Sequence, residues 1–239
     1  MGELRKKPCT AVILAAGQGR RMGTKIQKQY LLLAGKPVLY YSLDTFQKSE
    51  LIDKICIVTG AGDEEYCRQE IVERYGFTKV NQIIAGGAER YLSVWNALQT
   101  LDGNGYVFIH DGARPFVDEA MITRVYEEVC AFHACVVGMP VKDTIKIVDE
   151  DRYAVSTPPR STMWQIQTPQ CFVTAEIREA YQKMMEAGDD SVTDDGMVME
   201  TYGIRGVRMI KGSYENMKIT TPEDMLLGEA ILKGRSTER

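Results

Sequence analysis

The chain has 239 residues, 44% of them hydrophobic, and its 29 lysines and arginines against 33 aspartates and glutamates give a formal net charge of −4. This size predicts one globular domain over residues 1–239, and the absence of an apolar run near the ~18 residues that cross a bilayer, or of an apolar leader, predicts a cytoplasmic protein without a membrane partner. The acidic balance argues against a nucleic-acid partner, and six scattered cysteines without a C-x-x-C pair argue against a disulfide framework or a structural zinc site.

Short aliphatic runs alternate with helical patterns over the first 141 residues. The predicted strands are TAVILAA from Thr10, KICIVT from Lys54, NQIIAG from Asn81, YVFIHD from Tyr106 and ACVVGMPV from Ala134. Helices are predicted between them over 38–46, 64–75, 90–100 and 118–132, where apolar residues recur three and four positions apart. The alternation predicts an α/β, Rossmann-like fold with a mostly parallel sheet and helices on both faces, and ligands at the carboxyl ends of the strands.

The pattern changes after Val141. Residues 142–160, KDTIKIVDEDRYAVSTPPR, contain two β-like stretches around an acidic turn, with no helix between them. Because an isolated hairpin is only marginally stable in water, we predict a protruding β-arm at about 141–162 that contacts a second subunit and makes a homodimer. An excursion that folds back on its own domain explains the pattern about as well. Helices are then predicted over 174–187, 193–202 and 221–233, with a strand at VRMIKG.

Cations concentrate after the first predicted strand, in a chain that is acidic overall. Gly17 and Gly19 leave backbone N–H groups open to a phosphate, although a structural turn would also explain two glycines. The sequence GQGRRMG is neither G-x-G-x-x-G nor a Walker loop, which argues against a nicotinamide-dependent enzyme. Four cations follow closely and favour a site for a phosphoryl or nucleotidyl group: Arg20, Arg21, Lys25 and Lys28.

Three further motifs follow predicted strands or precede helices. Asp111 in HDGARPF is placed to hold a magnesium ion beside a phosphate, or alternatively to cap the next turn and pair with Arg114. We interpret His110 as a core histidine without a role. The glycines of GGAERYLSV also fit a simple helix start, and Lys218 in ENMKITTPED also fits a surface lysine. Together the motifs favour an anion site on one edge of the sheet.

The ordered set LAAGQGRRM, KQY, GGAERYLSV, HDGARPF, VKDTIK, QTPQ, TDD and NMKITTPED resembles the cytidylyltransferases that act on 2-C-methyl-D-erythritol 4-phosphate, over about residues 11–230. The resemblance implies that the substrate phosphate attacks the α-phosphorus of CTP and releases pyrophosphate, with one Mg²⁺, in the non-mevalonate route to isoprenoids. Three positions depart from the usual pattern of that family: Gln27 replaces a proline, Ala88 an acidic residue and Gly112 an alanine.

The resemblance also implies the roles of individual residues. Transition-state stabilisation would come from Arg20, Lys28 and Lys218. The nucleotide would be bound by Ala15, Ala16, Gly17, Gly19, Gly87 and Ser93. The methylerythritol phosphate would be surrounded by Asp111, Arg114, Thr144, Arg160, Thr168 and Thr193, with Thr144 and Arg160 coming from the other subunit's arm and Asp111 also holding the metal.

Two alternatives have different consequences. A ribitol 5-phosphate cytidylyltransferase shares the glycine loop, the lysines and QTPQ, whereas HDGARP, VKDTIK and the spacing from Arg160 through Trp164 to QTPQ favour methylerythritol phosphate. A nucleotide-binding regulatory module would bind CTP without releasing pyrophosphate. The combined presence of Arg20, Lys28, Asp111 and Lys218 argues against the second.

Overall fold

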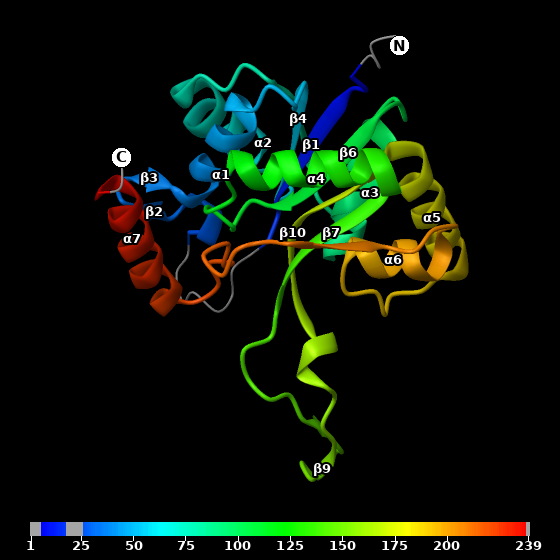
Figure 1. The fold of residues 1–239 in the computed structure, drawn as a ribbon. Helices are drawn as coiled ribbons and strands as arrows, with labels where there is room; N and C mark the ends of the chain where they lie inside the picture. Colours follow the sequence, from blue (N-terminus) through cyan, green and yellow to red (C-terminus); the bar gives the residue numbers. More distant parts are fainter. Residues whose placement is uncertain (1–5, 18–25, 238–239) are drawn as a thin grey trace, which may run out of the picture.

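A seven-stranded sheet runs through the computed structural model, which describes residues 6–17 and 26–237 (Figure 1). The strand order is β11-β7-β10-β6-β1-β4-β5. The strands are β1 (Cys9–Ala15), β4 (Lys54–Thr59), β5 (Val80–Ala85), β6 (Tyr106–Asp111), β7 (Ala134–Pro140), β10 (Trp164–Val173) and β11 (Arg208–Lys211). Neighbouring strands are parallel, except that β10 runs antiparallel to both β6 and β7. The prediction of a mostly parallel α/β sheet is confirmed.

Helices cover both faces of the sheet because both faces of the central strands are apolar. Ala11 and Ile13 of β1 join the core on one face, and Val12 between them joins the core on the other. The first face is covered by α1 (Val38–Lys48), α2 (Glu64–Cys67) with its π-helical continuation η3 (Arg68–Glu73), and α4 (Glu119–Phe132). The second is covered by α3 (Arg90–Thr100), α5 (Thr174–Ala187) and α6 (Asp195–Tyr202).

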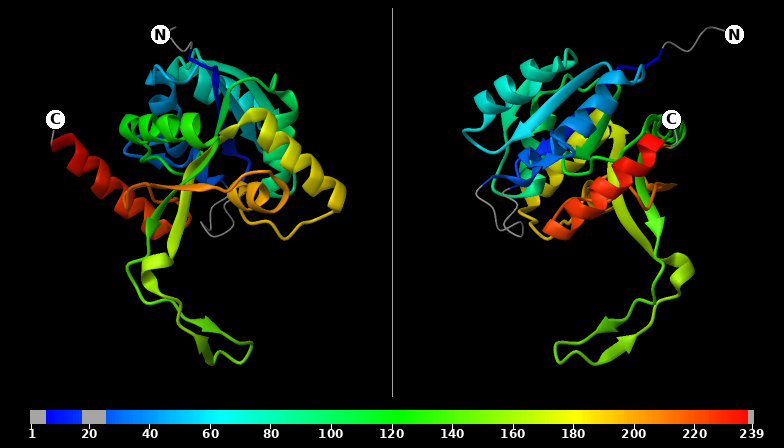
Figure 2. Two further views of the ribbon diagram at one scale, coloured as in Figure 1. Left: turned by 45° about the vertical axis from the view of Figure 1, so that its right-hand side comes forward. Right: turned by 90° about the vertical axis from the view of Figure 1, so that its left-hand side faces the viewer.

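A small satellite packs at the edge of this body (Figure 2). It consists of the ribbon β2 (Leu32–Leu33) and β3 (Lys36–Pro37) and the last helix, α7 (Pro222–Thr237), around a third apolar cluster with Leu33 and Phe116. The helix predicted over 193–202 begins at Asp195, because the Asp194 carboxylate accepts the N–H of Met197 and caps the first turn.

Strand β10 was not among the predicted strands, yet it lies between β6 and β7. Its sequence, WQIQTPQCFV, carries a proline and three glutamines, which are uncommon in a central strand. The register shifts between Ile166 and Gln170, and the peptide bond before Pro169 is cis. The buried Gln170 is fully used: its amide nitrogen donates to the Asp194 carboxylate at 2.8 Å, and its oxygen accepts from Gly196 N at 2.9 Å. Such pairing offsets the cost of burying an amide.

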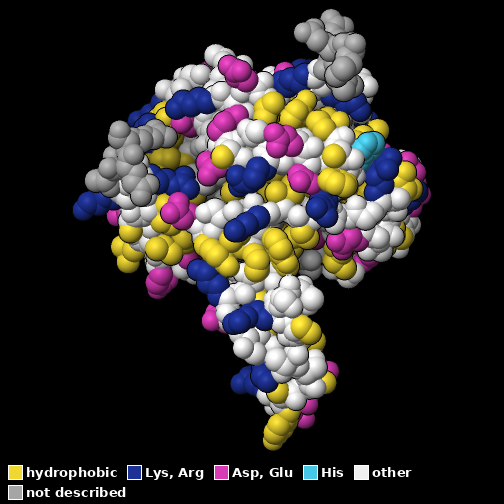
Figure 3. All heavy atoms as spheres, viewed as in Figure 1, with side chains coloured by type: hydrophobic (Ala, Val, Ile, Leu, Met, Phe, Trp, Pro, Cys, Tyr) yellow, Lys and Arg dark blue, Asp and Glu magenta, His cyan; other side chains and the backbone are white. Residues whose placement is uncertain are grey.

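The arm leaves the body between β7 and β10 (Figures 1 and 2). Its hairpin pairs β8 (Ile147–Val148) with β9 (Ala154–Ser156). Tyr153 and Val155 are 74% and 65% exposed, and Figure 3 shows apolar side chains at the end of the arm. The excursion therefore does not fold back on its own domain, and no part of the chain that the structure describes covers Tyr153 or Val155.

Five of the six cysteines are buried and Cys130 is exposed, and all six are free thiols. The interpretation of the cysteines as core residues is thus confirmed for five of them. Within the described part of the chain, no helix has both the length and the apolar character needed to cross a membrane.

We expect Phe172→Ala in β10 to lower the free energy of unfolding by about 3–5 kcal/mol, because the ring is fully buried in the sheet core and its loss leaves a cavity. Ile204→Ala is the control, since Ile204 is 70% exposed and its change should stay within about 0.5 kcal/mol. Urea unfolding followed by circular dichroism measures both. Equal effects of the two substitutions would contradict a central position for β10.

Candidate functional site

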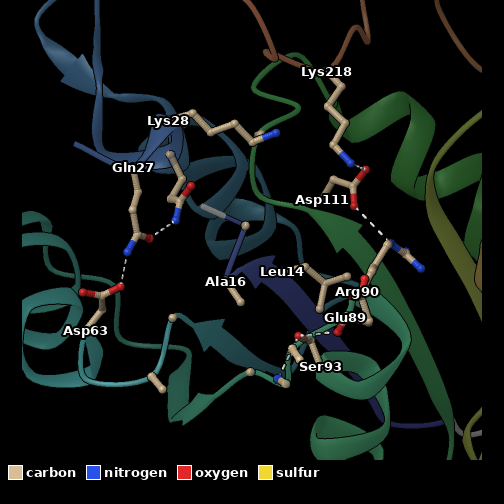
Figure 4. A pocket seen from close by; sticks show the side chains of 18 residues that line it. Leu14, Ala16, Gln27, Lys28, Asp63, Glu89, Arg90, Ser93, Asp111 and Lys218 are labelled. Carbon is tan, nitrogen blue, oxygen red and sulfur yellow. Dashed lines mark hydrogen bonds and ion pairs between the residues drawn. The ribbon is translucent and has the colours of Figure 1, made fainter. Parts of the chain in front are cut away.

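A cavity of about 710 Å³ opens at the carboxyl ends of β1, β4, β5 and β6 (Figure 4). After β1 the chain runs outward to β4 and β5 and then returns to β6 on the other side of β1. Such a reversal separates the loops on its two sides and is the usual ligand position in open α/β sheets. Ala16 and Gly17 line the cavity after β1, Gly86 and Gly87 after β5, and Asp111 at the end of β6.

The buried Asp111 carboxylate is surrounded by cations. Lys218 Nζ lies 2.9 Å and Arg114 Nε 3.4 Å from Asp111 Oδ2, while Arg90 Nε lies 3.5 Å from Oδ1. Burial by itself opposes ionisation, but Lys218, Arg90 and Arg114 outweigh it and hold the pKa of this carboxyl well below its usual range. Asp111 is therefore ionised across the physiological pH range.

Arg90 was not assigned a role from the sequence. It opens α3 and bridges two carboxylates, because Nη1 and Nη2 also donate to Asp195 at 3.0 and 2.7 Å. Asp195 is fully buried and accepts a further hydrogen bond of 2.6 Å from Tyr181 Oη. These charges hold the pKa of Arg90 well above its usual value despite its burial. The available signal was an arginine three positions after the second glycine of GGAERYLSV.

Lys218 reaches Asp111 from the loop between β11 and α7, so the interpretation of Lys218 as a surface lysine is wrong. The loop is held by Asn216, which is fully buried. Asn216 Nδ2 donates to Thr168 O at 2.8 Å, and Asn216 O accepts from Arg114 Nη1 at 2.8 Å. The hydrogen bonds of Asn216 thus help to position both Lys218 and Arg114 beside the Asp111 carboxylate.

Lys28 enters the cavity from the short helix η2 (Lys28–Tyr30), and Figure 4 shows its side chain extended toward the Asp111 side. The residue before it, Gln27, donates a hydrogen bond to Asp63 and accepts one from Gln29. Gln29 is buried and also donates to Ala15 O. In place of the proline usual in the resembled family, a chain of side-chain hydrogen bonds thus restrains the segment that presents Lys28.

The loop after β5 is shaped by close contacts and by Ser93. A Cβ on Gly87 would lie 2.3 Å from Leu92 Cβ, so the glycine is required by the packing of this loop itself. Ser93 Oγ accepts from Gly87 N at 3.1 Å and donates to Glu89 O at 3.2 Å, which fixes the loop at the cavity wall. A Cβ on Gly17 would meet only Lys28 Cε, at 3.9 Å, among the described residues. The lack of a side chain at Gly17 therefore leaves open space in the cavity.

The structure brings together many, but not all, of the residues expected to form the site. The cavity is lined by Ala16, Gly17, Lys28, Gly87, Ser93, Asp111 and Lys218. Ala15 is buried at the end of β1, and Thr168 is buried beneath Asp111. Thr193 lines a second cavity of about 400 Å³, which shares Glu89 and Arg90 with the first. Thr144 and Arg160 lie outside both cavities, at the base of the arm. Gly19 and Arg20 are outside the described residues.

The residues present are compatible with a magnesium ion. No cluster of three or more His, Cys, Asp or Glu side chains occurs among the residues that the structure describes. Mg²⁺ commonly uses one or two carboxylates together with substrate phosphates and water, so one buried carboxylate is sufficient. Asp111 lines the cavity, and among the described residues its Oδ1 has only a long contact of 3.5 Å to Arg90 Nε, so this oxygen is the less engaged of the two.

Comparisons with known proteins agree on one family. A family model described as 2-C-methyl-D-erythritol 4-phosphate cytidylyltransferase matches residues 9–234. A protein of that name from Lachnospira eligens is 50% identical over 226 residues, which are 94% of this chain and 99% of the relative. Another from Lachnoclostridium phytofermentans is 46% identical over 94% of this chain and 96% of the relative. The solved 4-diphosphocytidyl-2C-methyl-D-erythritol synthase from Anaerococcus prevotii has a TM-score of 0.84 at 33% identity, covering 95% of this chain and 97% of that one.

Burial lowers the pKa of His110 to about 4 from an ordinary 6.5. Between these values the unfolded chain binds a proton that the native chain does not, so stability falls as the pH falls from 6.5 toward 4. We expect the wild type to lose about 3 kcal/mol more free energy of unfolding between pH 7 and pH 4 than His110→Gln does. Urea unfolding at a series of pH values measures this difference. His133 is present in both proteins and cancels, and parallel pH profiles would contradict the prediction.

Proposed function

The chain belongs to the 2-C-methyl-D-erythritol 4-phosphate cytidylyltransferase family, and on that basis we propose that it transfers CMP from CTP to 2-C-methyl-D-erythritol 4-phosphate. The products would be 4-diphosphocytidyl-2-C-methyl-D-erythritol and pyrophosphate, a step of non-mevalonate isoprenoid biosynthesis. The observation that carries the proposal is the cavity at the strand ends, whose wall contains Lys28, Lys218 and the buried Asp111 carboxylate, with Lys218 paired to that carboxylate at 2.9 Å. Cations arranged in this way suit a reaction between two phosphate groups.

In the proposed reaction, a phosphate oxygen of the methylerythritol substrate forms a bond to the α-phosphorus of CTP. The bond from that phosphorus to the bridging oxygen breaks, and the electron pair leaves with pyrophosphate. Negative charge builds up on the oxygens around the α-phosphorus, and Lys28, Lys218 and Arg20 would stabilise it. No covalent enzyme intermediate is required, because positioning and charge stabilisation supply most of the catalysis in such transfers.

The nucleotide would lie along the loops after β1 and β5. Gly17, and Gly19 beyond the described residues, would let the triphosphate approach the main chain. Ala15, Ala16 and Gly87 would bind the cytidine end largely through backbone groups. Ser93 would act by holding Gly87, since its hydroxyl is already engaged with the loop.

We assign the metal to Asp111. Asp111 would hold Mg²⁺, whose chemistry when bound is the neutralisation of negative charge on phosphate oxygens. Asp111 would remain ionised to hold it, because the neighbouring cations keep the pKa of this carboxyl low. Arg114 and Thr193, from the turn after β6 and the segment before α6, would lie toward the methylerythritol phosphate.

The second half of the acceptor site would come from another subunit. Thr144 and Arg160 lie in an arm that projects from the body and exposes Ile147, Val148 and Val155. We propose that the chain is a homodimer in which each arm packs on its partner, covers these side chains and carries Thr144 and Arg160 to the partner's cavity. The exposed apolar surface of the arm supports this assembly.

The first test is pyrophosphate release with Mg²⁺, comparing CTP with ATP and methylerythritol phosphate with ribitol 5-phosphate. We expect release only with CTP and methylerythritol phosphate. Release with ribitol phosphate would support the nucleotide site but identify ribitol 5-phosphate as the acceptor. CTP binding without pyrophosphate release would indicate a regulatory module.

Lys28→Ala should lower kcat by ~10²–10³-fold, the usual effect of losing one preorganised donor. Lys183→Ala, at an exposed ion pair on α5, is the matched control and should leave the rate unchanged.

The exchange of arms predicts complementation between two inactive variants. We expect Lys28→Ala and Arg160→Ala to be inactive separately, and their mixture after subunit exchange to recover about a quarter of wild-type activity. Half of the randomly formed dimers are mixed, and one of the two sites in each combines an intact body with an intact arm. Turnover of the mixed sample measures this. If Arg160 served its own subunit's site, mixing would restore nothing.

A further inference from the structure

Beneath Asp111 lies a buried set of hydrogen bonds that the proposed reaction does not use. His110 is fully buried, and Thr168 is 3% exposed. Thr168 Oγ1 lies 3.0 Å from His110 Nδ1 and 3.0 Å from Asp111 N. His110 Nε2 lies 3.1 Å from Arg114 O. The imidazole and the hydroxyl therefore connect both ends of the turn from Asp111 to Arg114.

The chemistry of these groups fixes the direction of every bond. A carbonyl oxygen only accepts, so Nε2 of His110 carries the hydrogen that faces Arg114 O. Nδ1 of the neutral ring is then an acceptor, and the Thr168 hydroxyl donates its single hydrogen to it. The N–H of Asp111 donates to the same hydroxyl oxygen. The one proton of Thr168 is thus committed inside the protein.

The turn from Asp111 to Arg114, held by these hydrogen bonds, positions the charged side chains at its two ends. Arg114 N donates to Asp111 O at 2.9 Å and closes the turn, and Ser42 Oγ donates to Arg114 O from α1 at 3.1 Å. The side chains of Asp111 and Arg114 leave from opposite ends of this turn and meet at 3.4 Å. A displacement of either end would move the carboxylate that pairs with Lys218.

We infer that His110 and Thr168 are positioning residues, which fix the Asp111 carboxylate through the backbone of the 111–114 turn and do not themselves contact substrate. This inference rests on the proposed function and changes two assignments made from the sequence. Thr168, which was assigned to the acceptor-binding residues, is now assigned to the support of Asp111. His110, which had no assigned role, is given one. If Thr168 instead bound the acceptor directly, His110 would be irrelevant to its effect.

The test uses variants that remove one bond at a time. Thr168→Val keeps the shape and removes the hydroxyl, while Thr168→Ser restores it. His110→Gln keeps a donor near the place of Nε2 and loses the acceptor for Thr168. The matched control is Thr174→Val, because Thr174 is 2% exposed and donates to Gly105 O at 3.2 Å, at the opposite end of the sheet. Steady-state kinetics with both substrates and thermal unfolding are measured for each.

We expect Thr168→Val and His110→Gln each to lower kcat by ~10–100-fold, with KM for both substrates within about threefold of wild type, because a misplaced carboxylate weakens the transition state more than binding. Their double variant should be no slower than the slower single variant, since both break the same connection. Thr168→Ser should recover wild-type kcat within about threefold, and Thr174→Val should keep it while losing stability.

Several results would overturn the inference. A raised KM for the methylerythritol phosphate with unchanged kcat in Thr168→Val would make Thr168 a direct contact. Multiplying losses in the double variant would show that the two residues act independently. A rate of Thr168→Ser as low as that of Thr168→Val would also reject it, whatever the stability of the valine variant. If the wild type released no pyrophosphate, the proposed function would be refuted instead. Thermal unfolding of each variant would show whether a loss of rate comes from loss of the fold.

Discussion

The buried carboxylate of Asp111 is the constraint on which the rest of the site depends. Removing a carboxylate from water costs several kcal/mol unless close cations and hydrogen bonds replace the lost hydration. Here the cations come from three separate segments: the first turn of α3, the turn after β6 and the loop before α7. Each segment must therefore reach the end of β6 for the fold to be stable. The same convergence leaves cations around the place where phosphates would react, so stability and chemistry require one arrangement.

The glutamine side chains of β10 form hydrogen bonds that link this strand to neighbouring segments around the cavity. Gln170 binds the first turn of α6, and Gln167 donates to Ser213 O and accepts from Asn216 in the loop that carries Lys218. Between them, Thr168 lies against the start of the 111–114 turn. One short polar stretch thus ties together three regions around the cavity. This explains why a central strand carries amides where aliphatic side chains would be usual, and why its buried polar groups incur little cost.

The sequence predicted the parallel strands well and the antiparallel one not at all. β4 and β6 each contain four consecutive apolar residues, and such runs indicate buried strands directly. β10 has no such run, because several of its side chains are polar and form hydrogen bonds instead of packing in the apolar core. For the site, Asp111 and Lys28 were found from their places after strands or glycines. The partnership of Arg90 with Asp195 was not, because the two lie 105 positions apart and only packing brings them together. The role of His110 was not predicted either, because a histidine in a buried strand is also typical of a core residue without a function.

The late position of Lys218 in the chain has a consequence for biosynthesis. During translation the strands β1, β4, β5 and β6 emerge first, followed by Asp111, while the nearest cation of that carboxylate emerges 107 residues later. Until then the end of β6 carries a charge without its closest partner, and β10 and β11 have not yet extended the sheet. The residues that would bind the nucleotide are therefore synthesised before the segments that complete the cation set around Asp111. The finished site forms in the last stage of synthesis, so a product truncated before residue 218 could not contain it.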